Sequence, residues 1–169
     1  MGLASIAGTE AWAQELIDFQ AWRREKVSEL LREVDEKVFS EQLHGSFGSL
    51  YIILNHLVWA EKVWLGRVDR DTVATMKPSN VAGLLEMWSE VNAKWSTLIH
   101  AASHEDINRE IEYFTSTGDR FTNSVLEIVI HMVDHSTYHV GQMMNAIRGF
   151  GMEPVSTNYI HYLRAKAKE

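Results

Sequence analysis

Residues 49–68 read SLYIILNHLVWAEKVWLGRV and predict one long, mostly buried helix. Apolar side chains recur in this stretch at the three- and four-residue spacing of an α-helix, and the run is too long for an ordinary strand. The two glycines and the serines of HGSFGS, residues 44–49, precede it and supply cap candidates. The helix is expected to end near Val68.

The same periodicity appears in three other segments and makes the expected class all-α. Only two prolines interrupt the chain, Pro78 and Pro154. Four helices of this length can each bury an apolar stripe, so the economical architecture is a four-helix bundle with long loops in one domain, residues 1–169. The other three helices are expected over about 9–38 from a Thr9 cap, 80–101 from an Asn80 or Ser79 cap, and 123–150 from a Thr122 or Asn123 cap.

A short β-hairpin is expected between the third and fourth helices. The helical pattern stops between Ser103 and Thr122, where IEYFTSTGDRFT places two β-favouring runs on either side of Ser-Thr-Gly-Asp. Beyond Pro154, the tail predicts one more helical piece from Ser156 to Arg164.

Composition excludes several classes of function. The chain has 46% hydrophobic and 23% charged residues, and no apolar run long enough to predict a membrane span. Its N-terminus lacks the basic segment of a signal peptide, which favours a cytoplasmic protein. The net charge of −7 disfavours binding to nucleic acid. Because cysteine is absent, any metal must be held by nitrogen or oxygen ligands.

Three histidines stand one helical turn apart in HMVDHSTYHVGQ, residues 131–142. Imidazoles four residues apart share a helix face and can chelate one ion, but three in a row span about 12 Å of helix axis. We therefore expect His135 and His139 to be the metal ligands. His131 is expected either to pack in the core or to contact the ligands without binding the metal. Two exposed histidines that share a face by chance remain the alternative.

His56 is the candidate for a third ligand, because it lies within the apolar helix of residues 49–68 and a buried imidazole needs a partner. A hydrogen bond to the backbone would satisfy it equally well. Neither a zinc-protease motif nor a di-iron helix motif fits, since Met132 follows His131 and Glu127 has the wrong spacing. A structural metal site would need a fourth protein ligand, for which the remaining histidines are His44, His100, His104 and His161.

The quoted helix, followed much later by VIHMVDHSTYHVGQMMNAIRGFGMEP, resembles the DinB family of metal-binding proteins. The resemblance extends from FQAWRREKVSELL to NYIHYLR, and its most specific part is H-x-x-x-H-x-G-Q with an upstream Asn55-His56. It implies a four-helix bundle in which His56, His135 and His139 bind zinc or nickel, and a homodimer. Val140 departs from the arginine that the family often carries there, which removes a potential anion contact.

The resemblance also implies a small-molecule substrate, since its relatives include thiol-dependent S-transferases and a maleylpyruvate isomerase that use low-molecular-weight thiols. The expected function is that of a hydrolase or a thiol-dependent S-transferase or isomerase, with no catalytic side chain assigned. The alternative is a noncatalytic protein, either a stress-response module or a dimeric scaffold, in which the metal links two helices structurally. Asn55, Asp134 and Gln142 are candidate partners of the ligating imidazoles. The six tryptophans are expected to build the core and a dimer face.

Overall fold

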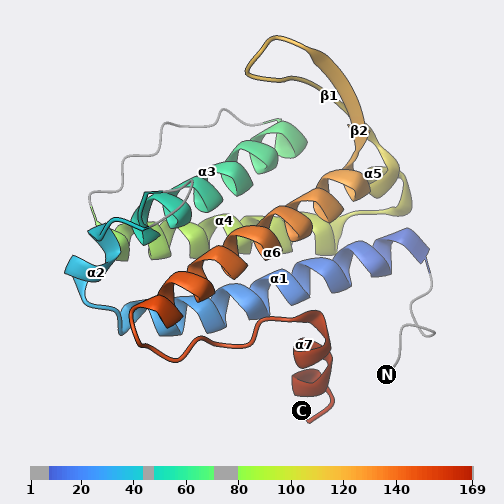
Figure 1. Cartoon of the computed structure of the whole chain (residues 1–169). Helices are drawn as coiled ribbons and strands as arrows, with labels where there is room; N and C mark the ends of the chain where they lie inside the picture. The colour runs from blue at the N-terminus through green and yellow to red at the C-terminus, as the bar shows by residue number, and fades with distance from the viewer. Residues whose placement is uncertain (1–7, 44–47, 71–79, 169) are drawn as a thin grey trace.

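The computed structural model describes residues 8–43, 48–70 and 80–168 (Figure 1). Within them the chain forms long helices, three short helices and one small sheet. In chain order these are α1 (Gly8–Arg32), α2 (Glu36–Ser40), α3 (Leu50–Asp69), α4 (Val81–Ala101), α5 (His104–Asn108), β1 (Glu110–Phe114), β2 (Arg120–Ser124), α6 (Val125–Gly149) and α7 (Tyr159–Lys166).

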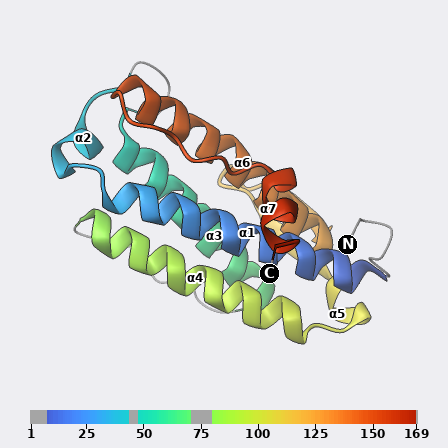
Figure 2. The ribbon, with the colours of Figure 1, turned by 90° about the horizontal axis from the view of Figure 1, so that it is seen from below.

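The four long helices form the predicted four-helix bundle. α1 packs against α4 and α6, and α3 packs against the same two helices, so that α1 and α3 lie diagonally across the bundle. Figure 2 shows these four helices side by side, with α7 lying across the outside of α1 and α6. α3 and α6 run antiparallel (Figure 1). Their contact matters for function because the candidate ligands lie on these two helices.

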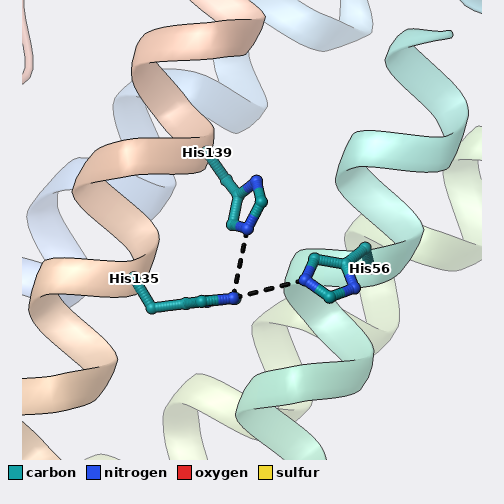
Figure 3. Close-up of side chains that lie close together, drawn as sticks. All are labelled: His56, His135 and His139. Carbon is teal, nitrogen blue, oxygen red and sulfur yellow. Dashed lines mark hydrogen bonds between the residues drawn. The ribbon is translucent and has the colours of Figure 1, made fainter. Parts of the chain in front are cut away.

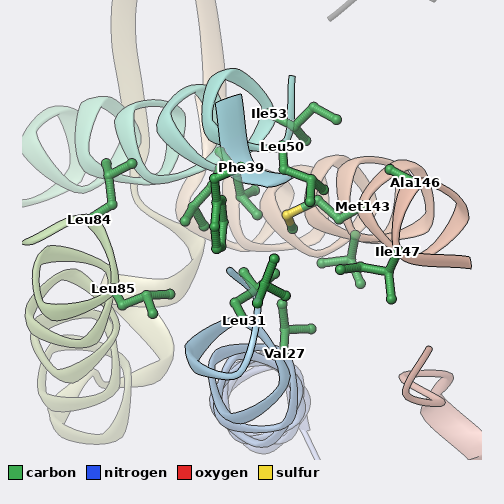
Figure 4. Packing of buried hydrophobic residues seen from close by; sticks show 14 of the residues in the cluster. Val27, Leu31, Phe39, Leu50, Ile53, Leu84, Leu85, Met143, Ala146 and Ile147 are labelled. Atoms are coloured by element: carbon green, nitrogen blue, oxygen red, sulfur yellow. The ribbon is translucent and has the colours of Figure 1, made fainter. Parts of the chain in front are cut away.

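The core consists of two clusters along the bundle axis. Figure 4 shows the first, in which side chains of α1, α3, α4 and α6 interdigitate around Phe39 of α2. The second cluster lies nearer the hairpin and includes Trp95, Ile107 and Val129. Trp88 and Trp95 are buried, as expected for packing residues, whereas Trp59 is 48% exposed and contributes to the surface.

The hairpin between α5 and α6 is confirmed. β1 and β2 pair antiparallel, with Tyr113 opposite Phe121. Gly118 in the turn has a positive φ of 89°, a conformation that favours glycine. Arg67 near the end of α3 donates a hydrogen bond of 3.1 Å to the carbonyl of Phe114, which ties the hairpin to the bundle.

Helix boundaries were predicted less accurately than helix existence. The first helix ends at Arg32 rather than near Val38, because Asp35 accepts a hydrogen bond from the Lys37 amide and starts the separate helix α2. The cap of α6 is Ser124 rather than Thr122 or Asn123, and it forms a capping box with Glu127. The short helix α5, capped by Ser103, was not predicted.

The other predicted boundaries agree more closely. Asn80, one of the two predicted caps, caps α4 and accepts a hydrogen bond from the Gly83 amide. Ser49 caps α3 in the same way through the Ile52 amide. The tail helix α7 begins at Tyr159 rather than at Ser156. Residues 44–47 of HGSFGS and the alternative cap Ser79 lie outside the described residues. No helix among the described ranges is long and apolar enough to cross a membrane.

Candidate metal centre

The pair of histidines on α6 is held by a well-defined helix. The capping box of Ser124 and Glu127 fixes the start of α6, and its apolar stripe packs into the bundle. His139 is buried, with 3% of its surface exposed, and His135 is half-buried one turn earlier. Their Nε2 atoms lie 3.1 Å apart. The four-residue spacing therefore aims both imidazoles at one point.

His56 reaches the same point from α3. Its Nε2 lies 3.3 Å from Nε2 of His135, and its ring centroid is 4.8 Å from that of His139. Figure 3 shows the three rings converging between the two helices. The potential ligand atoms of His56, His135 and His139 all lie within 4.8 Å of one another. The structure thus brings together the three histidines that the sequence singled out, from helices far apart in the chain.

The pKa values of the two imidazoles on α6 are lowered, which favours the neutral form that binds metals. Burial, together with the neighbouring rings of His139, His56 and His131, lowers the pKa of His135 to about 4. Burial also lowers the pKa of His139. Three imidazole nitrogens at this spacing fit a divalent cation of the kind that imidazole suits, including zinc and nickel.

Gln142 orients one of the rings. Its amide oxygen Oε1 lies 2.9 Å from Nδ1 of His139 and can only accept, so Nδ1 donates the hydrogen bond. That tautomer leaves the lone pair on Nε2, the atom that faces His135. Of the other two candidate partners, Asp134 is exposed and Asn55 is half-buried in α3.

The remaining histidines lie elsewhere. His131 is exposed rather than in the core, and its ring packs edge-on against Trp64 at 5.2 Å. His100 pairs with Asp18 at 2.8 Å on the surface, and His104 pairs with Glu10 at 3.1 Å. His161 lies on α7. His44 is outside the described residues.

Behind the imidazoles lies a buried polar network that the sequence analysis missed. Glu61 of α3 is 4% exposed, and its Oε1 accepts hydrogen bonds from Gln20 at 3.0 Å and from Ser136 at 2.8 Å. Its Oε2 accepts from the indole nitrogen of Trp88 at 2.9 Å. The carboxylate therefore joins α1, α3, α4 and α6 at one point. The presence of a glutamate, Glu61, in the middle of an apolar helix could have indicated this network from the sequence.

Arg23 of α1 balances this carboxylate. It is 2% exposed, and its guanidinium donates to the side chain of Gln20 and, at 3.1 Å, to the carbonyl of Val133. Burial lowers the pKa of Arg23 to about 10, and Glu61 opposes that shift. Burial raises the pKa of Glu61, against hydrogen bonds from Ser136 and Trp88 and the nearby guanidinium. Gln20 thus connects two buried ionisable side chains, Arg23 and Glu61, that make no direct ion pair among the described contacts.

One cavity of the described structure lies away from the imidazoles. It has a volume of about 550 Å³ and lies between α1, α6 and the segment before α7. Asp134 and Thr137 of α6 line it, on the side of that helix turned toward α1. The metal-binding geometry therefore belongs to the α3–α6 contact and not to this cavity.

Comparison with known proteins agrees with this architecture. A family model described as the DinB family matches residues 8–169. The protein named Protein DinB from Bacillus subtilis (strain 168) is 21% identical over 161 residues, which cover 90% of this chain and 94% of that protein.

Two crystal structures share the fold. A DinB-like protein from Bacillus subtilis superposes with a TM-score of 0.67 at 13% identity, covering 85% of this chain and 97% of that one. A DinB-like protein from Bacillus cereus gives a TM-score of 0.64 at 17% identity, covering 81% and 93% of the two chains. With the family model matching nearly the whole chain, we conclude that this protein belongs to the DinB family.

Proposed function

We propose that this protein is a cytoplasmic, metal-dependent enzyme that transfers a low-molecular-weight thiol to an electrophilic small molecule. In this proposal His56, His135 and His139 hold one zinc or nickel ion. The observation that carries it is the convergence of three imidazole nitrogens within 4.8 Å of one another. Three protein ligands leave a position for a further molecule, as in catalytic sites, whereas structural sites are closed by a fourth protein ligand.

The chemistry needs little from other side chains. When bound, a divalent cation would lower the pKa of a thiol or water molecule and so supply a nucleophile near neutral pH. The protein contributes a neutral donor in His135, because burial and the neighbouring rings keep its pKa at about 4. Gln142 fixes the tautomer of His139 through Nδ1. Glu61 and Ser136 hold α3 and α6 in register, so that His56 faces the pair on α6.

The ligand set favours an enzyme over a scaffold. In the described part of the chain, the side chains that come together as potential metal ligands are three histidines. His100 and His104, which were candidates for a fourth ligand, are engaged with Asp18 and Glu10 on the surface. A metal that only linked α3 to α6 structurally would be expected to have a fourth protein ligand.

We also propose that the protein works as a homodimer. Support comes from the resemblance to the family and from large apolar side chains on the surface, including Ile52, Ile130 and Ile160, which are 49%, 45% and 50% exposed. Light scattering during size-exclusion chromatography would test this. A mass of twice 19.4 kDa is expected, and a monomer at all concentrations would contradict it.

The activity can be tested by following thiol consumption. Protein stripped with a chelator and reloaded with zinc or nickel would be mixed with a panel of small thiols and an aryl halide as the electrophile. We expect loss of free thiol only in the metal-loaded protein, with formation of a carbon–sulfur bond and release of halide. His135→Ala should abolish it, and His100→Ala, which removes a surface imidazole paired with Asp18, should not.

Three outcomes would contradict the proposal in different ways. Thiol consumption by the metal-free protein would show that the metal is not needed. Electrophile hydrolysis without thiol consumption would identify a hydrolase. Metal binding with neither reaction would favour the scaffold.

A further inference from the structure

A row of aromatic rings leads from the three imidazoles to the hairpin. The ring of His131 lies 5.8 Å from that of His135 and 5.2 Å from that of Trp64. Trp64 in turn packs edge-on against Tyr113 of β1 at 4.9 Å. We call His131, Trp64 and Tyr113 the aromatic strip. It joins the candidate metal centre to β1 of the hairpin through successive ring contacts.

Arg67 lies at the far end of the aromatic strip. Its guanidinium carbon is 4.3 Å from the ring centroid of Trp64 and 4.6 Å from that of Tyr113. One terminal nitrogen donates to the Phe114 carbonyl at 3.1 Å. Two cation–π contacts and one hydrogen bond fix the plane of this cation, which lowers the entropic cost of its binding a planar anion.

His56 and Arg67 share one face of α3. They are eleven residues apart, close to three full helical turns, so both point along the same side. Arg67 folds back over Trp64, which lies about 12 Å along the helix axis from His56 at 1.5 Å per residue. Because α6 follows β2 directly in the chain, His131, one turn before His135, lies on the hairpin side of it.

The aromatic strip is accessible to a ligand. His131 is exposed, and Trp64, Arg67 and Tyr113 are each partly exposed. Trp59, whose ring lies 6.4 Å from that of His56, is 48% exposed at the other end. Accessible ring faces beside a cation can contact the apolar body and the anionic group of one ligand.

We infer that Arg67 and the aromatic strip form the subsite for a carboxylate carried by the thiol substrate. The sulfur would lie at the three imidazoles, the apolar body along His131 and Trp64, and the carboxylate at the Arg67 guanidinium, which packs over the Trp64 ring. Trp64 itself lies about 12 Å from His56 by the axial rise of α3. This inference rests on the proposed thiol chemistry and adds a substrate class to it, namely extended, anionic thiols. Arginine matches the planar carboxylate through paired N–H donors.

The test uses cobalt(II) in place of the native metal, since thiol coordination changes its absorption spectrum. Four thiols would be titrated: mercaptooctanoate and mercaptooctanol, which are long enough to reach Arg67, and mercaptopropionate and mercaptopropanol, which are not. Each pair differs in a carboxylate against a hydroxyl group. The proteins would be the wild type, Arg67→Met and Lys62→Met, the last removing an equal charge from another side of α3.

We expect wild type and Lys62→Met to bind mercaptooctanoate about tenfold more tightly than mercaptooctanol, as for a charge-assisted hydrogen bond. Arg67→Met should lose this preference while its affinity for the short thiols stays unchanged. If Arg67 only anchored the hairpin, Arg67→Met would bind all four thiols more weakly by the same factor. That result would overturn the inference. So would an undiminished preference for mercaptooctanoate in Arg67→Met. If no thiol changed the cobalt spectrum, the proposed thiol chemistry itself would fail, and this inference with it.

Discussion

Ser136 donates a buried hydrogen bond of 2.8 Å to the carboxylate of Glu61, linking α6 to α3 beside the three imidazoles. Ser136 follows His135 directly, and Glu61 lies five residues after His56 on its helix. The bond therefore fixes the register of the two helices that carry the ligands. It also makes Glu61 the centre of a network with Gln20 and Trp88.

Glu61→Ala should destabilise the fold by about 3–5 kcal/mol, the cost of leaving a buried charge without compensation. The substitution leaves Arg23 buried without its counter-charge and deprives Trp88 of its acceptor. Urea unfolding would measure the change in the free energy of unfolding. Glu29→Ala is the control, because Glu29 is an exposed partner of Lys26, and it should cost less than about 1 kcal/mol. Equal effects of both variants would argue against the network.

Gln142→Ala should weaken metal binding about 10- to 100-fold, the usual effect of removing the partner that orients a ligating imidazole. The amide oxygen of Gln142 accepts from Nδ1 of His139 at 2.9 Å. Competition with a chromophoric chelator would give the dissociation constants. Asn145→Ala serves as the control, since it removes an exposed amide one turn further along α6. An affinity unchanged by Gln142→Ala would show that His139 is held by other contacts.

The metal-free protein should lose stability as the pH falls from about 6.5 toward 4. Above that range His135 is neutral in both states, whereas within it the unfolded chain takes up a proton that the folded protein excludes, because the folded pKa is about 4. Unfolding free energies at pH 7 and pH 5, in the presence of chelator, would test this. His135→Gln should flatten the dependence relative to wild type, and His100→Gln should not. A slope that survives His135→Gln would assign it to other groups.

Much of the fold followed from periodicity. The long apolar stretch around His56 and the spacing of His135 and His139 are local patterns, and both formed the predicted helices. Boundaries depended on single capping bonds: Asp35 starts α2 where the apolar pattern alone continued the first helix to Val38. Such capping bonds shift the end of a helix by one or two residues, and hydrophobic periodicity does not show where they form.

The candidate site was predictable only in part. The spacing of His135 and His139 indicated a shared face, but their meeting with His56 depends on how α3 packs against α6. The network of Gln20, Arg23 and Glu61 was not predicted, since its members look like the polar positions of amphipathic helices until packing buries them. His131 shares the spacing of the pair, yet it points to the surface beside Trp64.

The most direct test of the three-histidine centre is the zinc content of His56→Ala compared with that of His131→Ala. Both proteins would be purified without an affinity tag, dialysed against equal free zinc and analysed by atomic absorption. The arrangement of the rings predicts that His56→Ala loses most of its zinc, while His131→Ala retains about one ion per chain, as a site with one open position requires. Equal retention by both variants, or equal loss, would contradict the assignment of His56, His135 and His139 as the ligands.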